Sequence, residues 1–557
     1  MKPLTQRLFL ATTALLFLVP GPLKAAAGVA SAHPAATQAG IQILEQGGNA
    51  FDAAIAVTST IAVVEPAGSG IGGGGFWLLY DSASGDTVML DGREKAPLAA
   101  TRDMYLDDQG NVVPGLSING ALSAGIPGEP AALVWLAENY GKLPLSQTLA
   151  PAIYAARNGF AVTERYQSLV GWRKELLLEH PAAAEIFLHD GEVPALGAPI
   201  IQEELAKTLE LIADKGHDGF YSGELAEKLV AGVQDAGGIW TMEDLAQYFV
   251  AVRKPVTFEY RDMQITSAAL PSSGGLVLAE SLNILENYDL VGLEEQEFIH
   301  LTVEAMRRAY RDRAEYMGDP DFVDVPTEML VSQFYADGLS QSIRMDRASP
   351  SSELAPTFVD GPKGQDTTHF SVIDHDGNMV SATLSINYPF GSGVVPPGTG
   401  VLLNDEMDDF SSKPGEPNAY GLVGAEANAI APGKRMLSSM SPTFVQTEDA
   451  ALVLGTPGGS RIISMVLLGI LEFEKGGNAE AIVNRPRFHH QYLPDVIQFE
   501  KDTLDLDLAS QLSALGHQFK SLNRTWGNMH AVLQNQKTGE VTAASDHRGE
   551  GQASVLP

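Results

Sequence analysis

Two adjacent threonines, Thr367 and Thr368, stand where an acidic stretch containing proline and serine gives way to strand-forming residues. A threonine hydroxyl is a weak nucleophile, and it attacks a carbonyl group only when a nearby base takes its proton. The 557 residues include no cysteine, which excludes a thiol nucleophile and thiolate metal ligands. Because threonine is also common at strand starts through β propensity alone, this pair by itself is a weak sign of catalysis.

Further polar and glycine-rich motifs surround this junction. Taken singly, each has an ordinary explanation, because charged residues are usually solvated and glycines often only form turns. The motifs are Asp91-Gly92-Arg93-Glu94, Ser385-Ile386-Asn387, residues 403–410 with Glu406 and Asp409, residues 437–442 with Ser438 and Ser439, and residues 455–461 with Gly458 and Gly459.

In their order and spacing, these motifs resemble those of the gamma-glutamyltranspeptidases. The resemblance runs from His33-Pro34 through the glycines of residues 72–75 to Asp546, so it covers nearly the whole chain. It implies an N-terminal nucleophile hydrolase with a four-layer αββα sandwich. It also implies self-cleavage between Asp366 and Thr367 into a large subunit, 28–366, and a small subunit, 367–557, which both contribute strands to one sandwich.

The resemblance assigns the catalytic chemistry to the new N-terminus. A free α-amino group titrates near ~8, so the amine of Thr367 can act as the base for its own hydroxyl. Ser385, where many members of the family have threonine, is expected to hydrogen-bond Thr367. Gly458 and Gly459, at the start of an apolar helix, are expected to form the oxyanion hole. No cofactor and no metal ion are implied.

The resemblance also assigns a site for the γ-glutamyl group of glutathione and similar compounds. Arg93 would bind the α-carboxylate in a bidentate fork, with help from the hydroxyls of Ser438 and Ser439. The expected acceptors of the γ-glutamyl group are water, amino acids and dipeptides.

The α-ammonium group of the substrate would bind at a second set of residues. Glu406 and Asp409 would supply carboxylates, and Asn387 would supply its amide oxygen. Pro414 to Gly421 would form a lid loop over the pocket, because proline and glycine favour a shaped, exposed loop. Tyr420 in this loop would reach toward Asn387.

The first residues predict export. Lys2 and Arg7 precede an apolar run at 8–19, Pro20-Gly21-Pro22 ends it, and the alanines at 25–27 offer a cleavage site. We therefore expect a signal peptide at residues 1–27 and a periplasmic or secreted protein, with a signal anchor as the alternative. A formal charge of −33 argues against nucleic acid or an anionic membrane as a partner.

Periodicity and turn signals predict the elements that hold the motifs in place. Residues 35–65 form two helices separated by Gly47-Gly48-Asn49, and the glycine-rich loop 68–75 leads into a strand hairpin ending near Arg93. Because this loop precedes a strand, its G-x-G-x-x-G spacing does not predict a dinucleotide site. Other expected elements are mostly helical residues at 129–347, strands at 368–374 and 379–386, helices at 462–473 and 504–515, and strands near Ala531 and Val541.

Three alternatives remain at this point. Two are relatives of the same family, a glutaryl-cephalosporin acylase and an enzyme acting on poly-γ-glutamate. The third is a periplasmic solute-binding protein, which the signal peptide and the charge also fit. Self-cleavage distinguishes the last class, because an enzyme of the expected kind gives two fragments on a denaturing gel and a binding protein gives one.

Overall fold

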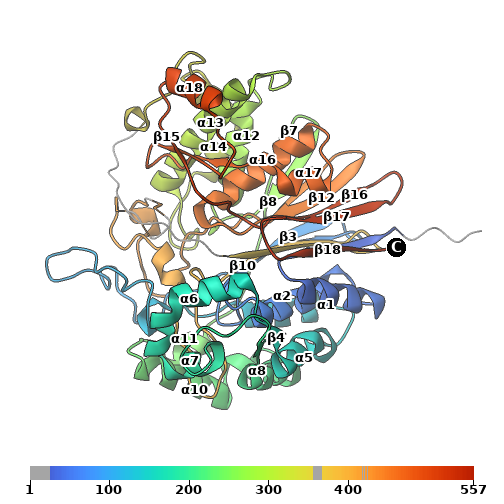
Figure 1. Cartoon of the computed structure of the whole chain (residues 1–557), viewed down its shortest axis with the longest axis vertical. Coiled ribbons are helices and arrows are strands. Elements are labelled where there is room, and N and C mark those ends of the chain that lie inside the picture. The colour runs from blue at the N-terminus through green and yellow to red at the C-terminus, as the bar shows by residue number, and fades with distance from the viewer. Residues whose placement is uncertain (1–24, 355–366, 417, 419–420, 423) are drawn as a thin grey trace, which may run out of the picture.

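The computed structural model describes residues 25–354, 367–416, 418, 421–422 and 424–557. Most of the expected signal peptide, Asp366 and Tyr420 therefore lie outside the described residues. Two antiparallel sheets are stacked at the centre of the molecule, and helices cover the outer face of each sheet (Figure 1). The predicted four-layer αββα sandwich is confirmed.

The seven-stranded sheet contains the strand that follows Thr367. Its strand order is β18–β1–β9–β10–β2–β3–β6, and all neighbours are antiparallel. The strands are β1 (Ala27–Ser31), β2 (Gly74–Asp81), β3 (Asp86–Gly92), β6 (Ala251–Arg253), β9 (Thr368–Ile373), β10 (Met379–Ser385) and β18 (Gln552–Leu556).

The six-stranded sheet packs against it with the order β17–β16–β12–β11–β8–β7. Its strands are β7 (Val256–Tyr260), β8 (Met263–Ser267), β11 (Thr443–Gln446), β12 (Ala450–Gly455), β16 (His530–Asn535) and β17 (Val541–Ser545). A small third sheet contains β13 (Phe488–His489), β14 (Ile497–Phe499) and β15 (Phe519–Ser521), and β4 (Phe160–Ala161) pairs with β5 (Pro199–Ile200).

Strand β2 shows why the sandwich has two cores. Successive side chains of a strand point to opposite faces of the sheet. Phe76 and Leu78 belong to the core that includes the second sheet, whereas Trp77 and Leu79 belong to the core beneath the helices on the other face. All four side chains are buried, so this strand is a continuous apolar run, as expected for a strand covered on both faces.

The helices form two outer layers (Figure 1). One layer, lying against the seven-stranded sheet, contains α1 (Pro34–Glu45), α2 (Ala50–Val64), α3 (Glu129–Asn139), α4 (Leu145–Thr148), α5 (Ala150–Asn158), α6 (Glu164–Glu179), α7 (Pro181–Phe187), α8 (Glu203–Lys215), α9 (Asp218–Tyr221), α10 (Gly223–Asp235) and α11 (Met242–Ala246). The other layer contains α12 (Gly274–Leu285), α13 (Glu295–Tyr316), α14 (Thr327–Leu330), α15 (Gln333–Ser340), α16 (Ile462–Glu474), α17 (Ala479–Asn484) and α18 (Leu506–Ala514).

The break between α1 and α2 lies where the sequence predicts it. Asn49 caps α2 by accepting hydrogen bonds from the amides of Phe51 and Asp52, and Asp52 accepts from the amide of Asn49 in return. Such a reciprocal capping box satisfies amide groups that have no partner within the helix. It begins a fully buried helix whose last turn leads toward the candidate site.

The region 129–347 is less uniformly helical than the sequence suggested, because it contains β6, β7 and β8. These strands of three to five residues lie between helices, and the turn at Arg261 has a positive φ of 56°. Short strands are stabilised by pairing with distant strands, here β3 and β11, and such pairing leaves little trace in local sequence.

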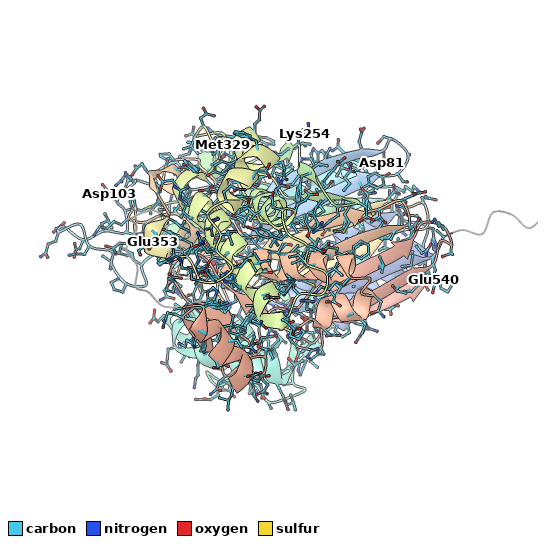
Figure 2. The ribbon with its side chains drawn as sticks, turned by 90° about the horizontal axis from the view of Figure 1, so that it is seen from above. Asp81, Asp103, Lys254, Met329, Glu353 and Glu540 are labelled. Carbon is cyan, nitrogen blue, oxygen red and sulfur yellow. The ribbon has the colours of Figure 1, made fainter. Side chains whose placement is uncertain are left out.

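The surface reflects the acidic composition. Asp103, Glu353 and Glu540 are exposed at the edges of the molecule (Figure 2). Among the described residues, none of the helices has both the length and the apolar character that crossing a membrane requires.

Candidate active site

Thr367 immediately precedes β9, a strand in the middle of the seven-stranded sheet, and only 4% of it is exposed. It lines a pocket of about 280 Å³, part of which is open to solvent. Of the predicted site residues, the same pocket is lined by Arg93, Ser385, Asn387, Glu406, Asp409, Ser438, Ser439 and Gly459. Residues separated by more than 300 positions in the sequence thus meet at one place.

The hairpin of β9 and β10 positions Ser385 and Asn387. Leu384 pairs with Thr368 in the sheet, which places Ser385 across from Thr367. The hydroxyl oxygen of Ser385 accepts a hydrogen bond of 2.8 Å from the amide of Asn387. The side chain of Asn387, a residue with a positive φ of 72°, donates to the carbonyl of residue 405 over 2.9 Å.

The glycine-rich loop makes this arrangement possible. A Cβ atom on Gly73 would collide with the carbonyl oxygen of Ser385, and one on Gly72 would collide with that of Leu402. Glycine is therefore required where two backbones approach this closely. The glycines of this loop thus allow its backbone to pack closely against the segments of Ser385 and Leu402.

Arg93 forms the charged centre of the pocket. It follows β3, is only 1% exposed, and donates over 2.5 Å to Glu406 and over 2.5 Å to Asp409. Burial raises the pKa of Glu406 to about 7, although Arg93 acts in the opposite direction. Burial likewise raises the pKa of Asp409, again against the effect of Arg93. Arg93, Glu406 and Asp409 are thus paired with one another in the pocket. A ligand that carries both a negative and a positive group could replace these ion pairs with pairs of its own.

Glu406 has unused binding capacity. Its oxygen Oε1 is buried and has no hydrogen-bond partner among the described residues. A buried polar atom without a partner costs free energy, about 1–3 kcal/mol. A donor that entered the pocket would recover this energy, so the atom is a natural contact for a cationic ligand group.

The two predicted serines also line the pocket, and they lie in the segment before β11. Ser438 accepts from the amide of Met440 over 3.1 Å, and Ser439 accepts from Arg313 over 3.3 Å. Arg313 was not anticipated from the sequence. It is buried on α13 and its charge acts to lower the pKa of Asp409, so a second guanidinium lies near the pocket without being one of its lining residues.

Gly458 and Gly459 have positive φ values of 142° and 57° and precede α16, as the sequence predicts. Gly459 lines the pocket, whereas Gly458 is not among its lining residues. Amide groups at the start of a helix point outward and favour negative charge. The turn is therefore suited to hold an oxyanion.

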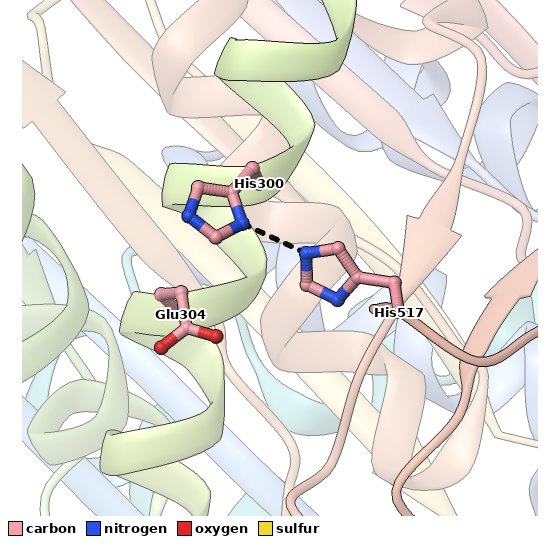
Figure 3. A group of neighbouring side chains, drawn as sticks. All are labelled: His300, Glu304 and His517. Carbon is pink, nitrogen blue, oxygen red and sulfur yellow. Dashed lines mark hydrogen bonds between the residues drawn. The ribbon is translucent and has the colours of Figure 1, made fainter. Parts of the chain in front are cut away.

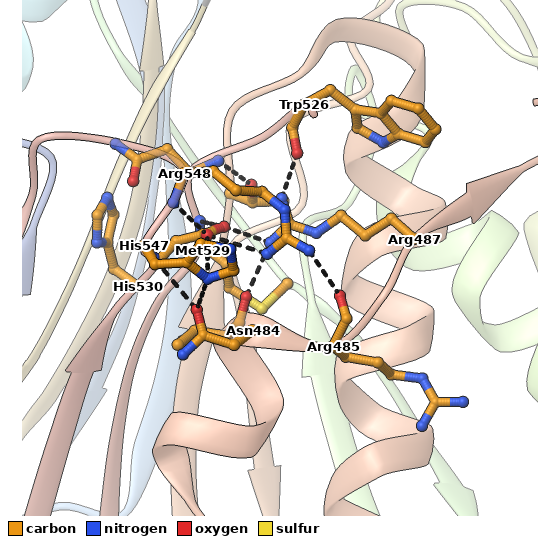
Figure 4. A network of polar contacts seen from close by, with 12 residues as sticks. Asn484, Arg485, Arg487, Trp526, Met529, His530, His547 and Arg548 are labelled. Atoms are coloured by element: carbon orange, nitrogen blue, oxygen red, sulfur yellow. Dashed lines mark hydrogen bonds and ion pairs between the residues drawn. The ribbon is translucent and has the colours of Figure 1, made fainter. Parts of the chain in front are cut away.

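A polar network around Arg487 and Arg548 lies in the same half of the molecule as α16 (Figure 4). Arg487 donates to the carboxylate of Asp546, and both groups are buried. A Cβ atom on Gly527 would lie 2.5 Å from Arg487 and from the sulfur of Met465. The methyl group of Met465 fills the space beside Gly458, where a Cβ atom would approach it to 2.6 Å. Met465 thus packs against both Gly527, next to Arg487, and Gly458 of the turn.

Part of the expected lid loop is described. Asn418 donates to Asp409 over 3.2 Å, and Leu422 lines the pocket. The loop therefore reaches the site at these two residues. The expected role of Tyr420 falls outside the described residues.

A second polar cluster lies apart from the pocket, where α13 meets the segment before β15. His300, Glu304 and His517 offer ligand atoms within 4.8 Å of one another (Figure 3). The two rings hydrogen-bond each other over 2.8 Å, and Glu304 accepts from Arg308 over 2.6 Å. Because guanidinium groups already neutralise Glu304, the cluster fits a hydrogen-bonded network better than a cation site.

Neighbouring residues of α13 also bind the segment of Ser349 and Ser351, which precedes the expected cleavage position in the sequence. Ser349 donates its amide to Glu304 over 2.9 Å, and Ser351 donates its amide to Asp495 over 2.7 Å. Arg307, which is buried, donates to both Ser351 and Asp495. Residues on either side of the expected cleavage position are thereby joined.

We expect Asp495→Ala to lower the melting temperature by several degrees. The substitution removes one of the two carboxylates paired with the buried Arg307 and leaves the other, Glu304, at 3.4 Å. Because the side chain of Asp495 is 38% exposed, the loss should stay below the cost of about 3–5 kcal/mol for breaking a fully buried pair. Thermal unfolding followed by circular dichroism measures the effect. Glu353→Ala, an exposed change in the same segment, is the matched control and should leave the melting temperature unchanged. Equal melting temperatures for Asp495→Ala and the wild type would contradict a stabilising role.

The fold and the position of Thr367 define a class of protein. A threonine at the head of a central strand, between two stacked sheets covered by helices, is the arrangement of the N-terminal nucleophile hydrolases. A solved structure with the same architecture is that of cephalosporin acylase from Bacillus halodurans, which superposes with a TM-score of 0.83 at 28% identity over 98% of this chain and 99% of that chain.

Within this class, the chain belongs to the gamma-glutamyltranspeptidase family, whose model matches residues 36–556. It is 44% identical over 537 residues to the glutathione hydrolase proenzyme of Escherichia coli, covering 95% of this chain and 91% of that protein. The Bacillus subtilis proenzyme of the same name is 36% identical, with 94% and 90% covered. The solved structure of Helicobacter pylori gamma-glutamyltranspeptidase gives a TM-score of 0.57 at 45% identity, covering 58% of this chain and 94% of that chain.

Proposed function

We propose that this family member cleaves itself between Asp366 and Thr367 and then transfers γ-glutamyl groups, from glutathione and related compounds, to water or to amino acids and dipeptides. The observation that carries the proposal is the pocket itself. It combines a threonine beside the expected cleavage position with the buried Arg93, the buried carboxylate of Glu406 and the partly buried carboxylate of Asp409. A γ-glutamyl group needs both kinds of charge, because its far end is a zwitterion.

Substrate binding would proceed by an exchange of ion pairs. In the empty pocket Arg93 is paired with Glu406 and Asp409. The α-carboxylate of the substrate takes Arg93 as its partner, in a bidentate fork, with Ser438 and Ser439 beside it. The α-ammonium group then replaces Arg93 as the partner of Glu406 and Asp409. No charge is left unpaired, so the substrate suffers little net loss from desolvation.

The reaction begins when the hydroxyl oxygen of Thr367 attacks the γ-carbonyl carbon. Its proton passes to the α-amino group of the same residue, which later returns it to the leaving amine. The amides of Gly458 and Gly459 stabilise the negative oxygen of the tetrahedral intermediate, a contribution of about 3–4 kcal/mol where it has been measured in other enzymes. Water or an acceptor amine then releases the γ-glutamyl group from the threonyl ester. Ser385 helps to orient the nucleophile.

The proposal includes export to the periplasm or the medium, with residues 1–27 as the signal peptide. The large subunit 28–366 and the small subunit 367–557 remain associated as one sandwich. Support comes from the apolar run at residues 8–19 and from the relatives, which are named proenzymes.

We expect γ-glutamyl anilides to be cleaved at least 100-fold faster than glutaryl anilides. A glutaryl group has no ammonium, so Glu406 and Asp409 would lose their cation when it displaces Arg93, and a site built for a polar partner strongly rejects an analogue that lacks it. The comparison of kcat/KM for the two anilides checks this, and added glycylglycine should accelerate release from the γ-glutamyl compound.

The same pair of substrates distinguishes the cephalosporin acylase alternative. Asp409→Asn should reduce the ratio of kcat/KM for the γ-glutamyl anilide to that for the glutaryl anilide, because it removes one of the two carboxylates that bind the ammonium group. Comparable rates of the wild-type enzyme on both anilides would place the chain with the acylases.

A further inference from the structure

Glu65 lies beside the nucleophile, although nothing in its motif pointed to a role there. It follows the last residue of α2, and its side chain is only partly exposed. The hydroxyl of Thr368 donates to its carboxylate oxygen Oε2 over 2.7 Å, and Thr368 itself is fully buried. Through this bond the end of a helix in the outer layer is fixed to the first residue of β9.

Gly68 shows how closely Glu65 approaches Thr367. A Cβ atom on this glycine would lie 3.3 Å from the carboxyl carbon of Glu65 and 3.4 Å from the carbonyl oxygen of Thr367. The carboxylate and the backbone of the nucleophile therefore contact the same point. His33, Arg165, Tyr166 and Glu550 are the other ionisable residues that line the pocket containing Glu65.

Glu65 lies at the C-terminal end of α2, in a pocket that Arg165 also lines. The C-terminal end of a helix carries a partial negative charge, which repels an anion by about 0.3–1 kcal/mol. A cation close to Glu65 would reverse this effect. Cleavage before Thr367 creates such a cation, because the new α-amino group is an ammonium in its protonated form.

We propose that Glu65 is a positioning residue for the α-amino group of Thr367. The inference rests on the proposed cleavage between Asp366 and Thr367. The hydroxyl of Thr368 donates its hydrogen bond to Glu65. The lone pairs of the same hydroxyl oxygen can therefore accept a hydrogen bond from an N–H of the adjacent α-amine. The lone pair of the amine is then directed to the hydroxyl of Thr367.

The negative charge of Glu65 has a second effect. When Thr367 attacks the substrate, the proton leaves its hydroxyl oxygen and converts the α-amine to an ammonium group, while the oxygen forms a bond to the carbonyl carbon. Glu65 stabilises this ammonium until it gives the proton to the leaving amine. An opposite charge nearby raises the pKa of an amine, so Glu65 sets the pH above which the enzyme works.

The test compares Glu65→Gln with the wild type, using a γ-glutamyl anilide over a range of pH. Glutamine can still accept the hydrogen bond of Thr368, but it carries no charge. We expect complete cleavage into two fragments, a kcat at least fivefold lower, and an acid limb of the kcat/KM profile displaced to lower pH by half a unit or more. Glu550→Gln, which removes a carboxylate from the same pocket, should leave the profile unchanged.

Thr368→Val and Thr368→Ser complete the design. Valine removes the hydroxyl and should lower kcat as Glu65→Gln does, whereas serine keeps it and should retain most activity. An unchanged acid limb and kcat in Glu65→Gln would overturn the proposal, as would failure of this variant to cleave itself. A wild-type chain that stays whole, or that ignores γ-glutamyl anilides, would instead refute the proposed function.

Discussion

Thr367→Ala yields one uncleaved chain with no detectable γ-glutamyl transfer. The same hydroxyl is proposed to cut the precursor and to attack the substrate, so its loss removes both reactions. Alanine fits where Thr367 is buried next to β9, and the sandwich should therefore form normally. A denaturing gel and an anilide assay measure the two outcomes, and circular dichroism checks the fold.

Thr367→Ser is the matched control for this result. Serine keeps the hydroxyl and, after cleavage, the adjacent amine, but it lacks the methyl group that restricts the side-chain rotamer. We expect two fragments and reduced activity. Two normal fragments from Thr367→Ala would disprove the assignment of the nucleophile.

Arg93→Lys should lower kcat/KM for γ-glutamyl anilides by about 30-fold or more without preventing self-cleavage. Lysine keeps the positive charge that Glu406 and Asp409 require, so the pocket remains neutralised. It cannot form the planar bidentate fork with a carboxylate. Because the charge is kept and only the fork is lost, we expect a cost of about 2 kcal/mol, the lower end of the range for removing one partner of a desolvated charge pair, and every 1.4 kcal/mol corresponds to a factor of ten.

Arg102→Ala provides the comparison for Arg93. Arg102 also pairs with two carboxylates, those of Asp103 and Glu426, but all three side chains are exposed. Exposed ion pairs contribute little, so catalytic efficiency should be unchanged. If Arg93→Lys likewise kept wild-type efficiency with complete cleavage, the α-carboxylate site would have to be elsewhere.

Much of the candidate site could be predicted because it consists of short motifs whose residue types are unusual together. Thr367, Arg93 and Asp409 lie far apart in the sequence, yet the structure brings them to one pocket. Their own neighbours indicate turns and strand ends, which are the places where side chains can project into a site. The roles of these residues stay predictions until the variants above are measured.

Arg313 and Glu65 escaped prediction for different reasons. Arg313 belongs to a helix with several arginines, which in sequence is indistinguishable from a solvated face, and its burial results from packing against the segment of Ser439. Glu65 follows an apolar helix at a position where a polar residue is unremarkable. Its place beside the candidate active site becomes visible only through its hydrogen bond with Thr368, which is 303 residues away in the sequence. Long-range contacts of this kind have no local signal.

The strand order of the large sheet has a consequence for assembly. β1, from the region before the expected cleavage position, lies between β18 and β9, which both come from the region after it. The uncut chain can find this arrangement in a first-order process, since its strands are tethered to one another. Once the tether is cut, the two pieces must meet by diffusion, and recovery from denaturation becomes dependent on concentration. The lifetime of the mature enzyme is then governed by how slowly its sheet opens rather than by how readily it re-forms.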